Sequence, residues 1–200
     1  MFLEHLIHDP VYFFRIVVIT IFSITLHELA HGLAAISQGD DTPQRTGHMT
    51  LNPVVHMGWE SIIFLCLTGL SWGQMPVNPS KFRNGSQSNV IVSAAGPLCN
   101  LALALLFIFL IKISSAPGIG LILSSDFLYL AARMNLILCI FNFLPIPPLD
   151  GYHVFSESFP ALRELERNRM GMFFLMVIFL IPGFGFILAL IADFIIRVLT

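Results

Sequence analysis

The residues of this chain most suited to chemistry are two histidines and a glutamate in the stretch HELAH, residues 27–31. His27 and His31 are four positions apart, so on an α-helix both imidazoles lie on one face, one turn from each other, where they can share a metal ion. In the pattern HExxH the histidines bind zinc, and the glutamate, here Glu28, takes a proton from the water that the metal activates. The sequence therefore predicts a catalytic zinc centre that carries its own base.

The surroundings of HELAH favour this function over a chance arrangement. The motif lies inside an apolar run, and ionisable groups within a membrane-spanning segment are costly unless they serve a function. In the alternative interpretation the two histidines bond to backbone groups near a helix end, and the glutamate extends to the membrane surface. The apolar sequence around the motif makes that alternative the weaker of the two.

A third protein ligand is expected, since catalytic zinc usually has three and keeps the fourth position for water. The best candidate is Asp150, in the stretch NFLPIPPLDGYHVF at residues 142–155. Its prolines cannot continue a helix, so the preceding helix must end near Asn142. Non-helical backbone at membrane depth is tolerated only where it is buried in protein or lines a wet cavity.

Two alternatives stay open for this stretch. Asp150 could instead be the N-cap of a helix that begins near Gly151. Asn142 could donate to an oxyanion that develops on the scissile carbonyl, or it could simply cap a carbonyl at the helix end. Local sequence does not separate these roles.

The elements that position these residues are predicted to be membrane-spanning helices. Of the 200 residues, 56% are hydrophobic and 11% charged, outside the usage of soluble globular domains. One further apolar run, residues 61–73, is too short to cross a hydrocarbon core of about 30 Å. The stretches long enough to cross it are residues 11–36, 88–113, 119–144 and 170–199.

We therefore expect an all-α polytopic membrane protein that forms a single domain over residues 1–200. Pro182-Gly183 divides the last segment into a kinked helix or a tight helical hairpin, which gives four to six transmembrane helices. The net charge of −2 shows no basic arm, so no nucleic-acid partner is expected. Arg133 lies inside an apolar segment and needs a partner, but Asp126, two turns earlier, is about 10 Å away along the helix.

The two motifs together resemble those of the site-2 proteases, polytopic zinc metalloproteases that cleave other transmembrane segments within the bilayer. HELAH is similar to the HExxH of that family, and NFLPIPPLDG, residues 142–151, is similar to its second motif. Three further stretches resemble the small bacterial and archaeal branch of that family, which lacks PDZ and CBS domains. These stretches are TLNPVVH at 50–56, SWGQMPVNPSKFRN at 71–84 and SAAGPLCNL at 93–101.

The resemblance implies that His27, His31 and Asp150 bind one zinc ion per chain, that Glu28 is the base and that Asn142 assists at the oxyanion. It also implies peptide-bond hydrolysis in transmembrane protein substrates, and a short re-entrant or membrane-associated strand or loop between the first two long helices. A structural or gating role is expected for the histidines near that region, His48 and His56, since three ligands are already assigned.

The distribution of charge predicts the side of the membrane on which the site lies. His27 is about 24 Å along a helix that begins near Val11, so it is nearer the end that leads to Asp40 and Asp41. The loops on the opposite face offer mainly Lys112, whereas the site-bearing face would hold Arg45, Lys81, Arg83, Arg163, Arg167 and Arg169. The positive-inside rule makes that face cytoplasmic, in a prokaryotic plasma membrane.

The chief alternative function is a membrane metal-binding or metal-transport protein without a hydrolytic step. A transporter needs ligands along a path, whereas the sequence shows one clustered site with an adjacent carboxylate. The expected partners are the lipid bilayer and transmembrane protein substrates, and a regulatory membrane partner is compatible with either function.

Overall fold

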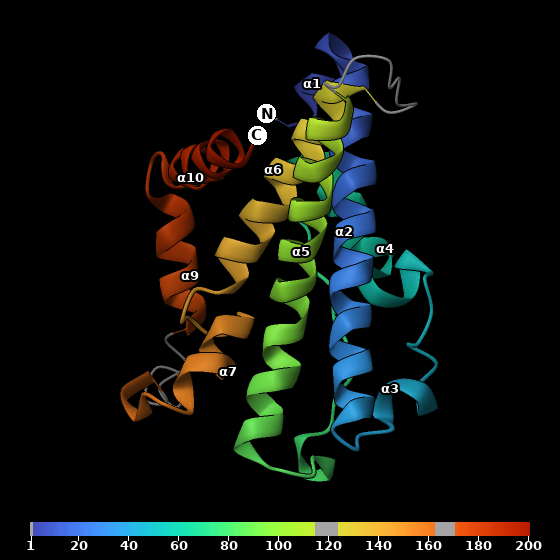
Figure 1. Ribbon diagram of the computed structural model, residues 1–200, viewed down its shortest axis with the longest axis vertical. Helices are drawn as coiled ribbons and strands as arrows, with labels where there is room; N and C mark the ends of the chain where they lie inside the picture. The colour runs from blue at the N-terminus through green and yellow to red at the C-terminus, as the bar shows by residue number, and fades with distance from the viewer. Residues whose placement is uncertain (1, 115–123, 163–170) are drawn as a thin grey trace.

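The computed structural model describes residues 2–114, 124–162 and 171–200. All regular secondary structure among these residues is helical, and no strand occurs among them. Three long helices run along the molecule and pack on one another: α2 (Pro10–Ser37), α5 (Ser86–Ser114) and α6 (Ser125–Asn142) (Figure 1). The predicted all-α architecture is confirmed. The short helix α1 (Glu4–His8) precedes this group and packs on α2.

Helix α2 has well-defined signals at both ends. Asp9 accepts a hydrogen bond from the backbone N–H of Tyr12 at 2.9 Å, and Pro10 occupies the first turn, where its missing N–H costs nothing. Its 28 residues extend about 42 Å, more than the hydrocarbon thickness of a bilayer. The chain leaves the helix through Gly39, whose φ of 102° lies in the left-handed region that favours glycine.

A polar cluster holds the segment after α2 in place. Asp40 is fully buried and accepts hydrogen bonds from the backbone N–H groups of Thr42 (2.9 Å) and Asn78 (2.6 Å). Lys81 donates to Asp41 at 2.6 Å, and this hydrogen bond holds the pKa of the Asp41 carboxyl below its ordinary value. Residues 40–42 and 78–81 are thereby joined at the carboxyl end of α2, where α3 (Thr42–Arg45) and the 3₁₀ helix η1 (Pro79–Lys81) begin.

The short apolar run predicted at 61–73 is a helix that continues into an extended chain. Helix α4 (Pro53–Thr68) begins after the N-cap Asn52, bends at Gly58 (φ 68°) and ends at Gly69 (φ 81°). It packs against α2 through Met57 and Leu65. Residues 70–78 then return as extended chain without strand pairing, so the membrane-associated element is a bent helix and a loop.

Helices α5 and α6 form the centre of the packing. Pro97 lies inside α5 and is fully buried, and α5 runs opposite to α2, since Ser88 near its start donates to Gln38 at the end of α2 at 2.8 Å. Helix α6 begins at the N-cap Ser124 and ends at Asn142, as the prolines predict. It leads through residues 143–149 into α7 (Asp150–Ser156) and η2 (Pro160–Leu162).

The last apolar segment is broken where Pro182-Gly183 predicts. Helices α9 (Gly171–Leu180) and α10 (Phe184–Leu199) meet at an angle of 80°, with Gly183 at φ 86° between them (Figure 1). The buried residues of α10, Ala192 and Ile196, pack against α5 and α6. Helix α10 therefore joins the central bundle, and α9 contacts the end of α6 through Phe179 and Phe141, whose ring centroids are 5.6 Å apart.

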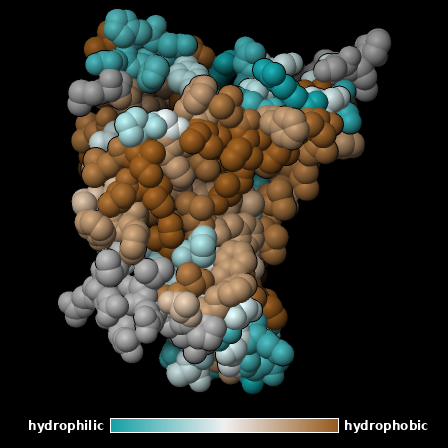
Figure 2. Space-filling model, turned by 90° about the vertical axis from the view of Figure 1, so that its left-hand side faces the viewer, coloured by the Kyte–Doolittle hydropathy of each residue, from teal (hydrophilic) through white to brown (hydrophobic). Residues whose placement is uncertain are grey.

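The four to six membrane spans expected are confirmed only in part. Among the described residues two helices qualify by length and composition, α2 and α5, or three if the bent pair α9 and α10 counts as one span. Within residues 119–144 the described helix covers only the 18 residues of α6, and these include the charged side chains of Asp126 and Arg133. A wide hydrophobic band between hydrophilic ends nevertheless covers the face that carries α9 and α10 (Figure 2).

Arg133 finds its partner on α10 and not on its own helix. Its Nε lies 2.8 Å from Oδ1 of Asp193, and its Nη2 donates to Oδ2 of the same residue at 3.3 Å. Tyr129 also donates to Oδ1 of Asp193, at 2.9 Å. This cluster of three residues joins α6 to α10, and the doubt about a pair with Asp126 was justified.

Candidate metal centre

His27 and His31 lie one turn apart on the buried face of α2, as their spacing predicts. The exposed fractions of the two residues are 7% and 8%. Nδ1 of His27 lies 2.6 Å from Oδ1 of Asn100, and Nδ1 of His31 lies 2.7 Å from the backbone carbonyl of Val92. A carbonyl oxygen can only accept, so the Nδ1 of His31 carries the proton and its Nε2 keeps a lone pair.

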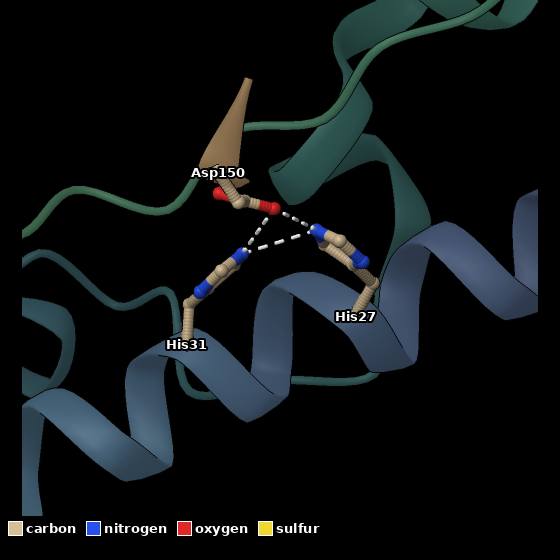
Figure 3. A group of neighbouring side chains, drawn as sticks. All are labelled: His27, His31 and Asp150. Carbon is tan, nitrogen blue, oxygen red and sulfur yellow. Dashed lines mark hydrogen bonds and ion pairs between the residues drawn. The ribbon is translucent and has the colours of Figure 1, made fainter. Parts of the chain in front are cut away.

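Asp150 faces the two histidines from the side opposite to their helix, α2 (Figure 3). It is the first residue of α7, so it is not the N-cap, which is Leu149, and its side chain makes no capping hydrogen bond. Its Oδ2 lies 3.1 Å from Nε2 of His27 and 3.4 Å from Nε2 of His31. The N-cap alternative for Asp150 is therefore wrong.

The three atoms that face one another fit a metal ion. The two Nε2 atoms are 3.0 Å apart, and with Oδ2 of Asp150 they enclose a single point. Zinc held tetrahedrally at its usual bond lengths separates its ligand atoms by roughly 3.3 Å, close to these spacings. Lone pairs and a carboxylate that converge in this way repel one another unless a cation lies between them. His27, His31 and Asp150 are thus able to hold zinc.

Two glycines let the backbone approach this centre closely. A Cβ on Gly96 of α5 would collide with Nε2 of both His27 and His31, so only glycine leaves room for an ion there. Gly151 has a similar role beside Asp150, since a Cβ at this position would collide with the carbonyl of Phe143. The start of α7 can therefore lie directly against the turn that ends α6.

Glu28 is buried beside the histidines, with an exposed fraction of 7%. The extended chain after α4 covers it: a Cβ on Gly73 would lie 2.5 Å from its Oε1 and 2.8 Å from its Cγ. Glu28 makes no ion pair with a lysine or arginine among the described residues. Its carboxylate is thus held close to the metal ligands without a basic side chain to neutralise it.

A cavity of about 1530 Å³ opens onto these residues. Its walls come from α2, residues 69–79, α5, α6, α7 and the bent pair α9 and α10. The metal ligands, Glu28 and Asn142 all line it, whereas most of the remaining lining is apolar, such as Phe141, Leu175 and Phe179. The candidate metal centre therefore faces a large, mostly apolar cavity between the helices.

Asn142 lies at the end of α6 and lines the same cavity. Its Nδ2 donates to the backbone carbonyl of Leu138 at 2.9 Å, which is the helix-end hydrogen bond of the alternative interpretation. An amide nitrogen carries two hydrogens, so one remains for another acceptor. His48 and His56 do not belong to the metal-binding group found among the described residues, and His56 is buried with its Nε2 2.7 Å from the carbonyl of Thr50.

Comparisons with known proteins agree with this chemistry. Residues 111–183 match the model of peptidase family M50. The chain is 33% identical over 196 residues to "Putative zinc metalloprotease YwhC" of Bacillus subtilis, and the match covers 93% of this chain and 90% of that protein. Rip2 of Mycobacterium tuberculosis, which carries the same description, is 31% identical over 171 residues, or 80% of this chain and 64% of Rip2. No solved structure matches the chain significantly.

The chain therefore belongs to peptidase family M50, and it is a zinc-dependent metalloprotease of the site-2 type. It is a membrane protein with zinc as its cofactor, and the predicted resemblance to the site-2 proteases is confirmed.

Several residues that shape the centre were not predicted. Gly96 and Asn100 both lie in SAAGPLCNL, which was noted only for its resemblance, although their spacing of four already puts them on one face of a helix. That glycine-and-asparagine face in an apolar segment was the available signal. The role of the Val92 carbonyl had no sequence signal, because any residue has a backbone carbonyl.

Proposed function

We propose that this chain is an intramembrane protease that hydrolyses peptide bonds within or near transmembrane segments of its substrates. One zinc ion per chain is held by His27, His31 and Asp150. The observation that carries the proposal is the convergence of these three ligand atoms beside Glu28 in a large apolar cavity between membrane helices. When bound, zinc acts as a Lewis acid and makes water more acidic.

The chain's own residues supply the proton transfer and the charge stabilisation. Glu28 accepts a proton from the attacking water and returns it to the leaving nitrogen, as a buried carboxylate without a basic partner is free to do. Asn142 donates its remaining Nδ2 hydrogen to the oxygen of the scissile carbonyl as negative charge develops there.

The cavity supports a substrate that is apolar and locally unwound. Helical carbonyls are already hydrogen-bonded and wrapped by side chains, so the scissile bond must leave its helix before water can attack it. We expect that glycine or proline placed near, but not at, the scissile bond speeds cleavage, and that leucine in place of native helix breakers slows it. Cleavage of such a substrate series by purified protein measures this effect.

The finer architecture and sidedness also belong to the proposal. We propose that α6 crosses the membrane beside α2 and α5, and that residues 1–200 act as a single protease domain in a prokaryotic plasma membrane. Lys81 and Arg83 lie near the carboxyl end of α2, since Lys81 donates to Asp41 and the N–H of Arg83 donates to the carbonyl of Gln38. Lys112 lies in the last turn of α5, at the opposite end of the bundle.

This distribution supports a cytoplasmic position for the end of α2 that bears the site. Arg45, also used in that prediction, lies in α3 just after α2, whereas Arg163, Arg167 and Arg169 lie outside the described residues.

Metal transport without hydrolysis is the weaker candidate. Among the described residues His27, His31 and Asp150 form a single group able to hold a metal ion, whereas a transport path needs successive sites. A hydrolase needs a general base such as Glu28 beside that group, whereas a carrier does not need one.

Glu28→Gln tests the proposed function, because it keeps the volume of the side chain and removes its base. We would co-produce the parent and the variant with a panel of single-span membrane proteins, follow cleavage by gel and measure bound zinc in the purified proteins. The expected result is full zinc with cleavage reduced about 10²- to 10⁴-fold. Parent-level cleavage by a zinc-loaded Glu28→Gln protein would end the proposed mechanism, and zinc flux without cleavage in both proteins would favour the transporter.

A further inference from the structure

A chain of buried amides lies behind His27, on the side away from the metal ligands. Asn100 of α5 and Asn135 of α6 are both fully buried, although asparagine is among the residues least often found in that state. Nδ2 of Asn100 lies 3.1 Å from Oδ1 of Asn135, and Nδ2 of Asn135 lies 2.9 Å from the carbonyl of Ala131. Together with the contact between Asn100 and His27, these hydrogen bonds join three helices.

The direction of every hydrogen bond in this chain follows from its last member. The carbonyl of Ala131 can only accept, so the amide of Asn135 must present its nitrogen there and its Oδ1 to Asn100. The amide of Asn100 must then donate with Nδ2, which leaves its Oδ1 facing Nδ1 of His27 at 2.6 Å. An amide rotated by 180° at either position would bring two donors or two acceptors together.

We infer that Asn100 and Asn135 are positioning residues that fix the tautomer of His27 for metal binding. Oδ1 of Asn100 can only accept, so the proton of a neutral His27 is held on Nδ1. Nε2 then keeps its lone pair, and Nε2 is the atom that faces His31 and Asp150. The carbonyl of Val92 sets His31 in the same tautomer, so both rings present ligand atoms to one point.

The hydrogen bonds that run from His27 through Asn100 and Asn135 to the carbonyl of Ala131, which we call the relay, also resist rotation of the His27 ring. A ring turned by 180° about its Cβ–Cγ bond would lose the hydrogen bond to Asn100 and leave a buried amide oxygen without a donor, at a cost of about 1–3 kcal/mol. Hydrogen bonds of this kind to a metal-binding histidine typically contribute about 10- to 100-fold in metal affinity. The inference rests on the proposed metal site, but the state of His27 before metal binds is measurable by itself.

The first test is made on the metal-free parent chain, and an altered protein serves only to assign its signals. ¹⁵N-histidine NMR of the full chain in detergent reports which ring nitrogen carries the proton, and loss of one signal set in His27→Gln assigns it among the seven histidines. We expect a protonated Nδ1 and an unprotonated Nε2 in His27. A proton on Nε2 would overturn the inference.

The second test compares substitutions along the relay. Asn100→Leu keeps the branching and the number of heavy atoms of the side chain but leaves Nδ1 of His27 without an acceptor, so we expect zinc affinity to fall about 10- to 100-fold. Asn135→Leu frees the Asn100 amide to rotate and should give a smaller loss, with both His27 tautomers visible by NMR. Asn100→Asp still accepts from Nδ1 but has no hydrogen to donate to Asn135, so it should keep the His27 tautomer and lose less zinc affinity than Asn100→Leu.

A neighbouring residue separates positioning from packing. Leu136 follows Asn135 in α6 and is buried in the apolar cluster with Ala104 and Ile108, away from the relay. We expect Leu136→Ala to lower the unfolding temperature while zinc affinity and the visible spectrum of the cobalt-substituted protein stay those of the parent. Asn100→Leu should change that spectrum and the affinity together.

Each result bears on the inference. Parent affinity and an unchanged cobalt spectrum in Asn100→Leu would reduce the relay to a structural network. If that variant does not fold, an unprotonated Nδ1 of His27 in Asn100→Asp, which preserves the acceptor, would have the same meaning. The expected His27 tautomer in a protein that binds no zinc would contradict the proposed function and leave the relay standing.

Discussion

Two polar clusters in this protein, one partly exposed and one buried, differ in whether their charges are already balanced. In the cluster between α6 and α10 the guanidinium of Arg133 meets the carboxylate of Asp193, with Nε and Oδ1 2.8 Å apart. In the cluster between α2 and α7, Nε2 of His27 and Nε2 of His31 face the carboxylate of Asp150, and none of the three is positively charged while the histidines are neutral. The first cluster is complete in itself, whereas the second is complete only with a cation.

The difference shows how a structural polar cluster in a membrane protein can be told from a functional one. A structural cluster pairs donors with acceptors, so its hydrogen bonds end within it. Around His27 and His31 the donors point outward, to Asn100 and to the carbonyl of Val92, and the acceptors point inward. The surrounding sequence alone does not separate the two cases, because both clusters lie in apolar helices.

The largest contrast is expected between Asp150→Ala and Asp193→Ala. Asp150→Ala removes one of the three proposed zinc ligands, so bound zinc and peptide hydrolysis should both fall to background. Asp193→Ala leaves Arg133 and Tyr129 without their acceptor, which should destabilise the fold by about 1–3 kcal/mol while the folded protein keeps its zinc. Metal analysis and thermal unfolding of the two purified proteins measure both effects.

A full equivalent of zinc with parent affinity in Asp150→Ala would mean that this residue is no ligand. Loss of zinc from folded Asp193→Ala would remove the distinction between the clusters.

Gly96→Ala should abolish metal binding without removing any ligand. The added Cβ collides with Nε2 of both His27 and His31, so we expect no zinc at concentrations that saturate the parent. Gly185→Ala in α10 is the matched control, since no atom lies within 4 Å of its added Cβ. Isothermal titration of the two variants with zinc checks the prediction. Equal affinities in Gly96→Ala and the parent would show that the ion lies elsewhere.

Asn142→Ala should slow the reaction and leave the metal in place. The loss expected for one oxyanion donor is about 10²- to 10³-fold in kcat. Asn142→Asp should be no faster, because its carboxylate repels the developing charge. Steady-state kinetics with zinc content measured in parallel decides the role. Near-normal kcat in zinc-loaded Asn142→Ala would leave only the helix-end hydrogen bond to Leu138.

The smallest effect is expected when the balanced cluster is replaced by a neutral one. In Arg133→Gln/Asp193→Asn the two charges disappear together and a hydrogen bond between the side chains remains available. We expect the free energy of unfolding to change by no more than about 1 kcal/mol, since a partly exposed ion pair contributes little to stability. Denaturant unfolding in detergent measures it. A loss larger than that of Asp193→Ala alone would show that the charges themselves are needed.

Much of the centre was predictable because its parts are local or belong to a specific motif. The helical period by itself puts His27 and His31 on one face with Glu28 adjoining them, and three prolines by themselves end the helix at Asn142. Pro182-Gly183 likewise predicted the break between α9 and α10, though the angle of 80° depends on how α10 packs against α5 and α6. The number of spans is confirmed only in part, because apolar length alone does not say how much of a segment is one helix.

Residue type and spacing along one helix need no tertiary information, so the class of this protein and the chemistry of its ligands could be predicted from its motifs. Contacts across helices depend on the tertiary structure. They include the contact of Asp150 with His27 over 123 positions, the pairing of Arg133 with Asp193, and the place of Gly96 against the histidines. The relay through Asn100 and Asn135 belongs to the same group, since 35 positions separate two amides whose pairing depends on how α5 packs against α6. Such contacts follow from the packing of whole helix faces, which no single segment contains.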